Sequence, residues 1–210
     1  MALQRLFIDG FGQVELNRVT FSRTGEVEAQ CGWDVKDSED KPVICENGML
    51  LAVDKANSAI VLPSEDAVLI GLNYSAEHMY DTYVKAKLGV PGVEWTNSSR
   101  YANYFLGVDG GNFLPRIGFL SKGDVFMTDC VCYDSGDFAD DAAVMEAVKA
   151  CGETAIYGEA CELGAIKLSK TKNDAPIGGV LLKVVNDANK LGGFAMADGN
   201  PGIKFQVISA

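Results

Sequence analysis

The stretch Pro42-Val-Ile-Cys-Glu-Asn-Gly-Met-Leu-Leu-Ala-Val53 decides the predicted fold class of this chain. Its centre, Asn47-Gly48, is the strongest hairpin signal in the sequence, because both residues accept the positive φ angles of a tight β-turn. The apolar runs on either side, 42–45 and 49–53, have the length of short strands. The segment therefore predicts a β-hairpin in which 49–53 is the return strand.

Similar short runs recur on both sides of this hairpin, with alternating or continuous apolar residues bounded by turn residues. The predicted strands cover 14–21, 26–30, 59–62, 67–72, 114–120, 124–128, 155–157, 164–168, 179–185 and 203–208. The 23 glycines, spread without a period, suit the turns between many short strands.

Two segments have helical features instead. Residues 139–151 begin with acidic residues and place apolar side chains on one face, which predicts a helix. Residues 75–88 predict a second helix, in which Ser75 can cap the start and Gly89 and Pro91 end it.

The expected fold class is therefore mainly β with one or two short helices, an α+β arrangement of β-meander or barrel-like domains. We expect an N-terminal β-rich domain over residues 1–95 and a connection over 96–112. A C-terminal β-rich domain with one helix follows over 113–210.

The charge of the chain narrows the class of partner. The formal net charge is −11 over 210 residues, so the surface repels phosphate backbones and anionic lipids. Nucleic acid and membranes are therefore not expected as partners. The N-terminus lacks the apolar core of a signal peptide, so we expect a soluble protein made in a cytoplasm.

Six cysteines make about 3% of the chain, far below the density of a disulfide scaffold. Cys130 and Cys132 point to one face if they lie in a strand, which suits two buried thiols. Metal binding and a disulfide remain alternatives, although the spacing to Cys151 and Cys161 does not match a structural zinc site.

The sequence gives little support to catalysis. His78 is the single histidine, so every triad, dyad or histidine-based metal site would depend on it. Asp137, Asp140 and Asp141 suit a helix start better than a calcium site, because the spacing of a calcium loop is absent. We therefore expect no enzyme, no cofactor and no metal site.

Two apolar segments are candidate contact surfaces. Trp95, Tyr101, Tyr104 and Phe105 could stack on sugars or contact a protein, or they could fill the seam between two domains. The apolar start of the chain could form an arm that reaches a neighbour, or the first core strand. Its candidate contact residues are Leu3, Leu6, Phe7 and Phe11.

Several of these segments resemble parts of small head proteins of tailed bacteriophages. Residues 46–53 and 69–75 are similar to their β-meander segments, and 114–128 resembles a PRxGxLxxGDxFxT pattern. The ending, 180–185 and 198–208, is similar too. The resemblance implies a virion protein that decorates or cements the capsid exterior. It supplies no catalytic residue.

The sequence leaves three function hypotheses, of which the resemblance implies the first. The first is a virion structural protein in capsid assembly, partnered by the major capsid protein and forming a homo-oligomer such as a trimer. The second is a tail or fibre module that recognises a cell-surface glycan or partner protein through the aromatic residues of 95–105. The third is a hydrolase with an unfamiliar carboxylate or cysteine site.

Overall fold

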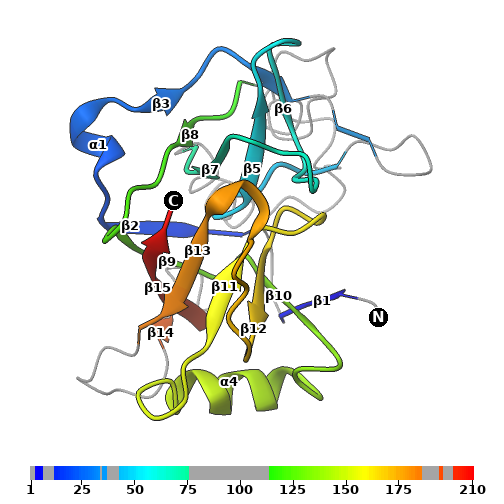
Figure 1. The fold of residues 1–210 in the computed structure, drawn as a ribbon, viewed down its shortest axis with the longest axis vertical. Helices are drawn as coiled ribbons and strands as arrows, with labels where there is room; N and C mark the ends of the chain where they lie inside the picture. Colours follow the sequence, from blue (N-terminus) through cyan, green and yellow to red (C-terminus); the bar gives the residue numbers. More distant parts are fainter. Residues whose placement is uncertain are drawn as a thin grey trace, which may run out of the picture.

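The computed structural model describes residues 3–6, 12–33, 35–36, 43–75, 114–185, 194–195 and 201–210 (Figure 1). These residues form two mixed β-sheets and few helices. The six-stranded sheet lies in the upper part of Figure 1, and the nine-stranded sheet lies below it.

The nine-stranded sheet combines strands from both ends of the chain. In spatial order they are β1 (Leu3–Arg5), β10 (Val131–Asp134), β12 (Ile166–Ser169), β11 (Tyr157–Glu159), β13 (Leu181–Val184), β15 (Pro201–Ser209), β9 (Val125–Thr128) and β2 (Val14–Arg18), with β14 (Phe194–Ala195) paired to β15. β10 and β12 run parallel, and the other neighbouring pairs run antiparallel.

The six-stranded sheet is built mainly from the first third of the chain. Its order is β3 (Val27–Glu28), β8 (Ile117–Gly118), β7 (Ile70–Asn73), β5 (Leu50–Asp54), β6 (Ala59–Val61) and β4 (Gly32–Trp33). β4 and β6 run parallel, and the other neighbouring pairs run antiparallel.

The longest described helix is α4 (Asp141–Lys149), which lies at the lower end of the molecule in Figure 1. The Asp140 side chain caps it by accepting a hydrogen bond from the Ala143 amide, at 2.8 Å, and Val144 and Val148 are buried. Two single-turn helices, α1 (Phe21–Thr24) and the 3₁₀ helix η3 (Ile177–Gly179), complete the described helices. No described helix has the length and apolar character needed to cross a membrane.

The prediction of a mainly β chain with one or two short helices is confirmed, and the helix expected over 139–151 is present as α4. Barrel closure is absent from the described residues. The edge strands β1 and β2 of one sheet do not pair with each other, nor do β3 and β4 of the other.

The predicted hairpin around Asn47-Gly48 is wrong in its pairing. The turn exists and Gly48 adopts a φ of 86°, but residues 43–46 form no strand. β5 pairs instead with β6 and β7, which occupy both of its edges. The Gly48 amide donates to the Asn73 carbonyl at 2.8 Å, so the turn contacts the end of β7.

The strand expected over 14–21 is also shorter than predicted. β2 ends at Arg18, and α1 begins at Phe21. The buried carboxylate of Asp124 accepts hydrogen bonds from the Thr20 amide and hydroxyl, at 2.9 and 2.7 Å. This contact fixes the end of the strand, and the alternating pattern of apolar residues does not reveal it.

The two sheets do not follow the two halves of the chain. β1 and β2 pair within the sheet formed mostly by residues after 124, and β8 joins the sheet formed mostly before residue 75. The proposed connection at 96–112 and the helix expected over 75–88 lie outside the described residues. The division into domains therefore stays a prediction.

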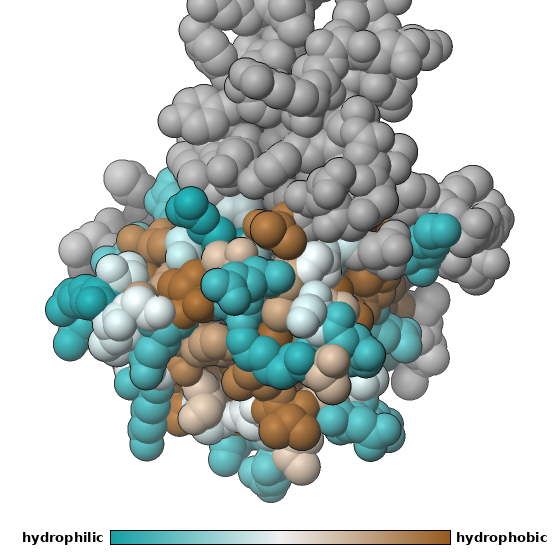
Figure 2. All heavy atoms as spheres, turned by 90° about the horizontal axis from the view of Figure 1, so that it is seen from above, coloured by the Kyte–Doolittle hydropathy of each residue, from teal (hydrophilic) through white to brown (hydrophobic). Residues whose placement is uncertain are grey.

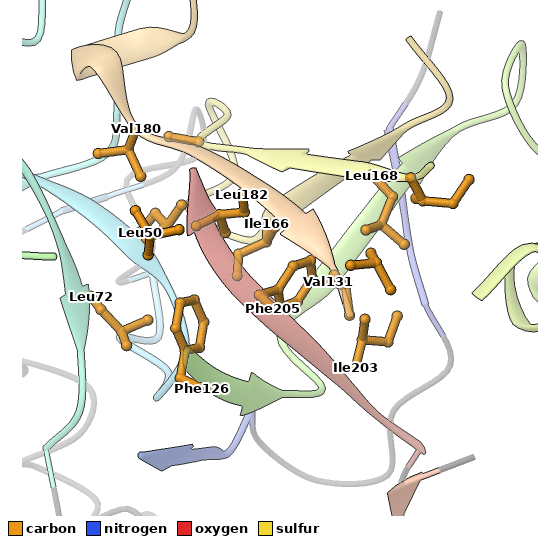
Figure 3. Close-up of a cluster of buried hydrophobic side chains, with 14 of the residues drawn as sticks. Leu50, Leu72, Phe126, Val131, Ile166, Leu168, Val180, Leu182, Ile203 and Phe205 are labelled. Atoms are coloured by element: carbon orange, nitrogen blue, oxygen red, sulfur yellow. The ribbon is translucent and has the colours of Figure 1, made fainter. Parts of the chain in front are cut away.

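The core consists of two clusters of buried side chains. We call one the aliphatic cluster, because aliphatic and aromatic side chains dominate it. Figure 3 labels part of it: Leu50, Leu72, Phe126, Val131, Ile166, Leu168, Val180, Leu182, Ile203 and Phe205. These side chains come from both sheets, so the aliphatic cluster is where the sheets pack against each other.

We call the other the thiol cluster. Its members are Cys31, Trp33, Cys45, Met49, Leu51, Val53, Ile60, Ile117, Cys130, Cys132, Cys161 and Ala165. Along β5, Leu50 and Ala52 lie in the aliphatic cluster, whereas Leu51 and Val53 lie in the thiol cluster. Because successive strand residues point to opposite faces, the two clusters lie on opposite sides of β5.

Candidate functional site

An open cleft of about 800 Å³ lies among the described residues. Its walls come from the loop after β6, the β11–β12 turn and the segment 173–178, with Leu3 of β1 at one side. Four acidic residues line it: Glu65, Asp134, Glu159 and Glu162. Because Lys167 is the one basic residue of the lining, the cleft disfavours anionic ligands.

The polar groups of this cleft interact with one another. Asn173 Nδ2 donates to Glu159 Oε2 at 2.6 Å, and Lys167 Nζ lies 3.8 Å from Glu159 Oε1. Both carboxylate oxygens of Glu159 therefore have partners within the chain. The open cleft can admit small polar molecules.

An ion pair lies beside Cys130, one of the cysteines of the thiol cluster. Arg5 Nη2 lies 2.9 Å from Glu46 Oε2, and Arg5 Nη1 donates to Cys130 Sγ at 3.1 Å. Glu46 Oε2 also accepts from the Gly12 amide at 2.6 Å. β1 positions Arg5, because its antiparallel register places Arg5 opposite Cys132 on β10.

Burial raises the pKa of Cys130 to about 12, although the neighbouring Arg5 acts in the opposite direction. Burial also raises the pKa of Cys45 well above its usual value. Both thiols are therefore protonated at neutral pH, and neither is a ready nucleophile. Because Cys130 is neutral there, Glu46 is the anion that balances Arg5.

Cys132 and Cys161 form a second thiol pair in this cluster. Their sulfur atoms lie 3.5 Å apart, and Cys161 Sγ donates to the Ala165 carbonyl at 3.1 Å. Cys132 is fully buried in β10, whereas Cys161 lines the cleft and is 5% exposed. Cys161 is therefore the member of the pair that borders the cleft.

The six cysteines are all buried and free, as the sequence indicates. Cys130 and Cys132 do share one face, since both belong to the thiol cluster. Within the described residues, no group of three or more His, Cys, Asp or Glu side chains is placed to hold a metal ion.

The acidic residues near α4 have structural contacts. Asp140 caps the helix, as described above, and Asp141 accepts a hydrogen bond from Tyr133 Oη at 2.8 Å. Burial and this hydrogen bond raise the pKa of Tyr133 to about 12. The helix-start interpretation is confirmed for Asp140.

The candidate contact residues at the start of the chain are only partly described. Leu6 is 1% exposed within the aliphatic cluster, and Leu3 packs against the thiol cluster as part of β1. Phe7 and Phe11 lie outside the described residues, as do His78 and the aromatic residues at 95–105. The described part, Leu3 to Leu6, is thus built into this chain's own sheet and core.

The segment 114–128, which carries the PRxGxLxxGDxFxT pattern, links the two sheets through β8 and β9. Asp124, 2% exposed, accepts from the Ser121 amide at 2.9 Å in addition to Thr20. Gly123 adopts a φ of 95° in the turn before it. Thr128 Oγ1 donates to the Gln13 carbonyl at 2.5 Å, which ties the end of β9 to β2. The pattern residues therefore have folding roles.

The described surface carries scattered apolar side chains. Val68 is 89% exposed, and four leucines are 36–44% exposed: Leu16, Leu69, Leu114 and Leu163. On the face in Figure 2, the coloured hydrophobic residues form small groups separated by hydrophilic ones. A docking surface on the part coloured there would have to combine polar and apolar contacts.

Sequence reasoning missed the ion pair Arg5–Glu46 and the pair Cys132–Cys161, whose members are 41 and 29 residues apart. No local spacing signals such contacts, because the strand pairing of β1, β10 and β12 creates them. No protein-family model matches this chain, and comparisons with curated proteins and with solved structures find no significant match.

Proposed function

We propose that this chain is a structural protein of a tailed-phage virion that decorates or cements the exterior of the capsid. The observation that carries the proposal is the segment 114–128, which resembles a pattern of small phage head proteins. The described roles of its residues support this, because a pattern set by folding suits a structural protein.

Those roles are distributed over the whole pattern. The backbone of Arg116 pairs with Tyr74 and with Ser75 Oγ, at 3.1 and 3.0 Å. Phe126 is fully buried in the aliphatic cluster, and Asp124 holds the β2–α1 connection. A sequence pattern made of such residues specifies the fold, and it leaves the residues of the partner surface unspecified.

The charge of the chain supports a place outside the shell. With a net charge of −11, the protein is repelled by packaged nucleic acid. Its proposed partner is the major capsid protein, and copies of this chain would form a homo-oligomer, such as a trimer, around a symmetry axis of the shell.

The chemistry of the described residues favours this role over catalysis. Cys45 and Cys130 are held protonated by burial, and the carboxylates of Glu159 and Asp124 are occupied by hydrogen bonds. The glycan-binding alternative depends on aromatic residues at 95–105, which lie outside the described residues. No described feature favours it.

The test begins with virions of the phage whose genome encodes this chain, purified on a density gradient. We expect mass spectrometry to find the chain at a copy number close to a simple fraction of the major capsid protein. Purified chain added to shells that lack it should bind and remain bound through a moderate rise in salt, because apolar contacts are only weakly screened.

Three outcomes contradict the proposal. The encoding genome could lack capsid and portal genes, purified virions could lack the chain, or the chain could bind neither empty nor filled shells. Binding to a glycan array by protein that does not bind shells would favour the tail or fibre module.

A further inference from the structure

Cys132 and Cys161 are placed for a reaction with each other. Their sulfurs lie 3.5 Å apart, and a disulfide needs about 2.05 Å, so the atoms must approach by about 1.5 Å. Cys132 is held in β10 between β1 and β12. Cys161 precedes the turn that leads into β12, where the Gly164 amide donates to the Cys161 carbonyl at 2.9 Å. A turn can adjust by this amount more easily than a central strand.

The cleft borders one of these two cysteines. Cys161 lines the cleft of about 800 Å³, whereas Cys130, Cys132 and Cys45 are absent from its lining. A small oxidant that enters the cleft therefore meets Cys161 first. Cys132 lies directly behind it.

The two thiols also differ in acidity. The hydrogen bond shared with Cys132, aided by the Leu163 backbone and by Lys167, lowers the pKa of Cys161 against the opposing effects of burial and of Glu162. The same hydrogen bond, together with burial, raises the pKa of Cys132. Cys161, the member of the pair that lines the cleft, is thus the one that forms a thiolate more readily, and thiolates are the form that reacts with oxidants.

We propose that Cys132 and Cys161 form an oxidation site, in which a peroxide oxidises Cys161 and Cys132 then closes an intramolecular disulfide. This site goes beyond the proposed virion function and does not depend on it.

The reaction balances in two steps. The Cys161 thiolate attacks one peroxide oxygen, so the S–O bond forms, the O–O bond breaks, and the leaving hydroxide takes a proton to become water. The Cys132 sulfur then attacks the Cys161 sulfenic acid, so the S–S bond forms and the S–O bond breaks. The Cys132 proton leaves with that hydroxide as a second water, and the peroxide is reduced by the two thiols.

The other cysteines of the thiol cluster lack this combination. Cys130 is bound by Arg5 Nη1 and remains protonated, and Cys45 is 0% exposed beside Asn73 Nδ2. Cys132 and Cys161 combine a sulfur–sulfur distance of 3.5 Å with one member that lines the cleft.

The test uses the full chain, reduced and then treated with hydrogen peroxide. Free thiols titrated after denaturation should fall from six to four per chain, and the product should stay monomeric on a non-reducing gel. Peptide mapping without reductant should find Cys132 linked to Cys161. An unchanged thiol count, a different pair or a link between two chains would overturn the proposal.

Three variants separate the steps. Cys132→Ser should stop at a Cys161 sulfenic acid, which a cyclic diketone probe captures. Cys161→Ser should leave Cys132 reduced under the same treatment. The control Cys151→Ser removes a buried thiol of the aliphatic cluster and should still form the link. If Cys132 is oxidised equally fast without Cys161, the proposal fails. If a variant does not fold, the wild-type peptide map decides.

Discussion

The aliphatic cluster and the thiol cluster lie on opposite faces of β5, yet they differ in composition. The aliphatic cluster holds one cysteine, Cys151, whereas the thiol cluster holds the other five. The same contrast repeats over residues 130–133, at the start of β10, where Val131 and Tyr133 belong to the aliphatic cluster and Cys130 and Cys132 to the thiol cluster.

The difference separates two kinds of stabilisation. The aliphatic cluster joins the two sheets through packing alone, so its contribution depends on volume and shape. The thiol cluster also has polar contacts, because Arg5, which lies beside the cluster, binds both Glu46 and Cys130. It can also change covalently at Cys132 and Cys161. The following predictions test this contrast, beginning with the largest expected effect.

Phe205→Ala should cause the largest loss, because the Phe205 ring is fully buried and lies 5.8 Å from the Phe126 ring. We expect the free energy of unfolding to fall by about 3–5 kcal/mol, measured by denaturant titration. Val68→Ala, at an 89% exposed position, is the control and should change it by less than about 0.5 kcal/mol. A small loss for Phe205→Ala would show that the aliphatic cluster does not hold the sheets together.

Oxidation of the wild-type chain should stabilise the thiol cluster by a comparable amount. A link between residues 29 positions apart should add about 3.5 kcal/mol and raise Tm by about 7–14 °C. Thermal melts of the oxidised chain, with and without reductant, measure the difference. The reductant should return Tm to that of the untreated chain, which remains folded. Oxidation should leave the Tm of the Cys161→Ser chain unchanged. A rise in Tm of this variant would mean that another pair of cysteines forms the link.

Glu46→Gln should weaken the ion pair of the thiol cluster. Glutamine has one acceptor oxygen and no charge, whereas Glu46 serves both Arg5 and the Gly12 amide. We expect a loss of about 1–2 kcal/mol in the free energy of unfolding, since the pair is only partly exposed. Asp174→Asn, which removes the exposed pair with Lys172, should leave stability unchanged within error. Equal effects would mean that burial does not strengthen the Arg5 pair.

Asp140→Ala should have the smallest effect, because it removes one cap from a helix at the edge of the aliphatic cluster. The expected loss is about 1 kcal/mol. Glu153→Ala, an exposed acid beyond the other end of α4, is the control and should not destabilise the chain. A loss above about 3 kcal/mol for Asp140→Ala would assign Asp140 a role beyond capping.

The sequence predicts features that depend on neighbouring residues. The helix at 141–149 follows from its acidic start and its apolar face. Cys130 and Cys132 belong to one cluster, as a two-residue period predicts, although Cys130 precedes the strand β10. The strand β9 lies within the predicted run 124–128, and β12 and β15 overlap the predicted runs 164–168 and 203–208 but extend beyond them. These predictions hold because the responsible interactions span only a few residues.

The wrong predictions concern strand pairing and strand ends, which neighbouring residues alone do not determine. Asn47-Gly48 does form a turn, but β6 and β7 occupy the edges of β5, so the expected partner at 42–45 is displaced. Similarly, the alternation over 14–21 predicts one strand, and the buried Asp124 ends it by binding Thr20. Each outcome depends on a residue that is distant in the sequence.

The sequence by itself determined the mainly β class, the acidic charge and the burial of the cysteines, because composition and local period suffice for these. Only the tertiary structure decided which cysteines meet, which strand brings Arg5 to Glu46, and that the ends of the chain share one sheet. The physical reason is that strand register is fixed by pairing across the sheet. A register places side chains from distant segments within a few ångströms, and no local pattern records that distance.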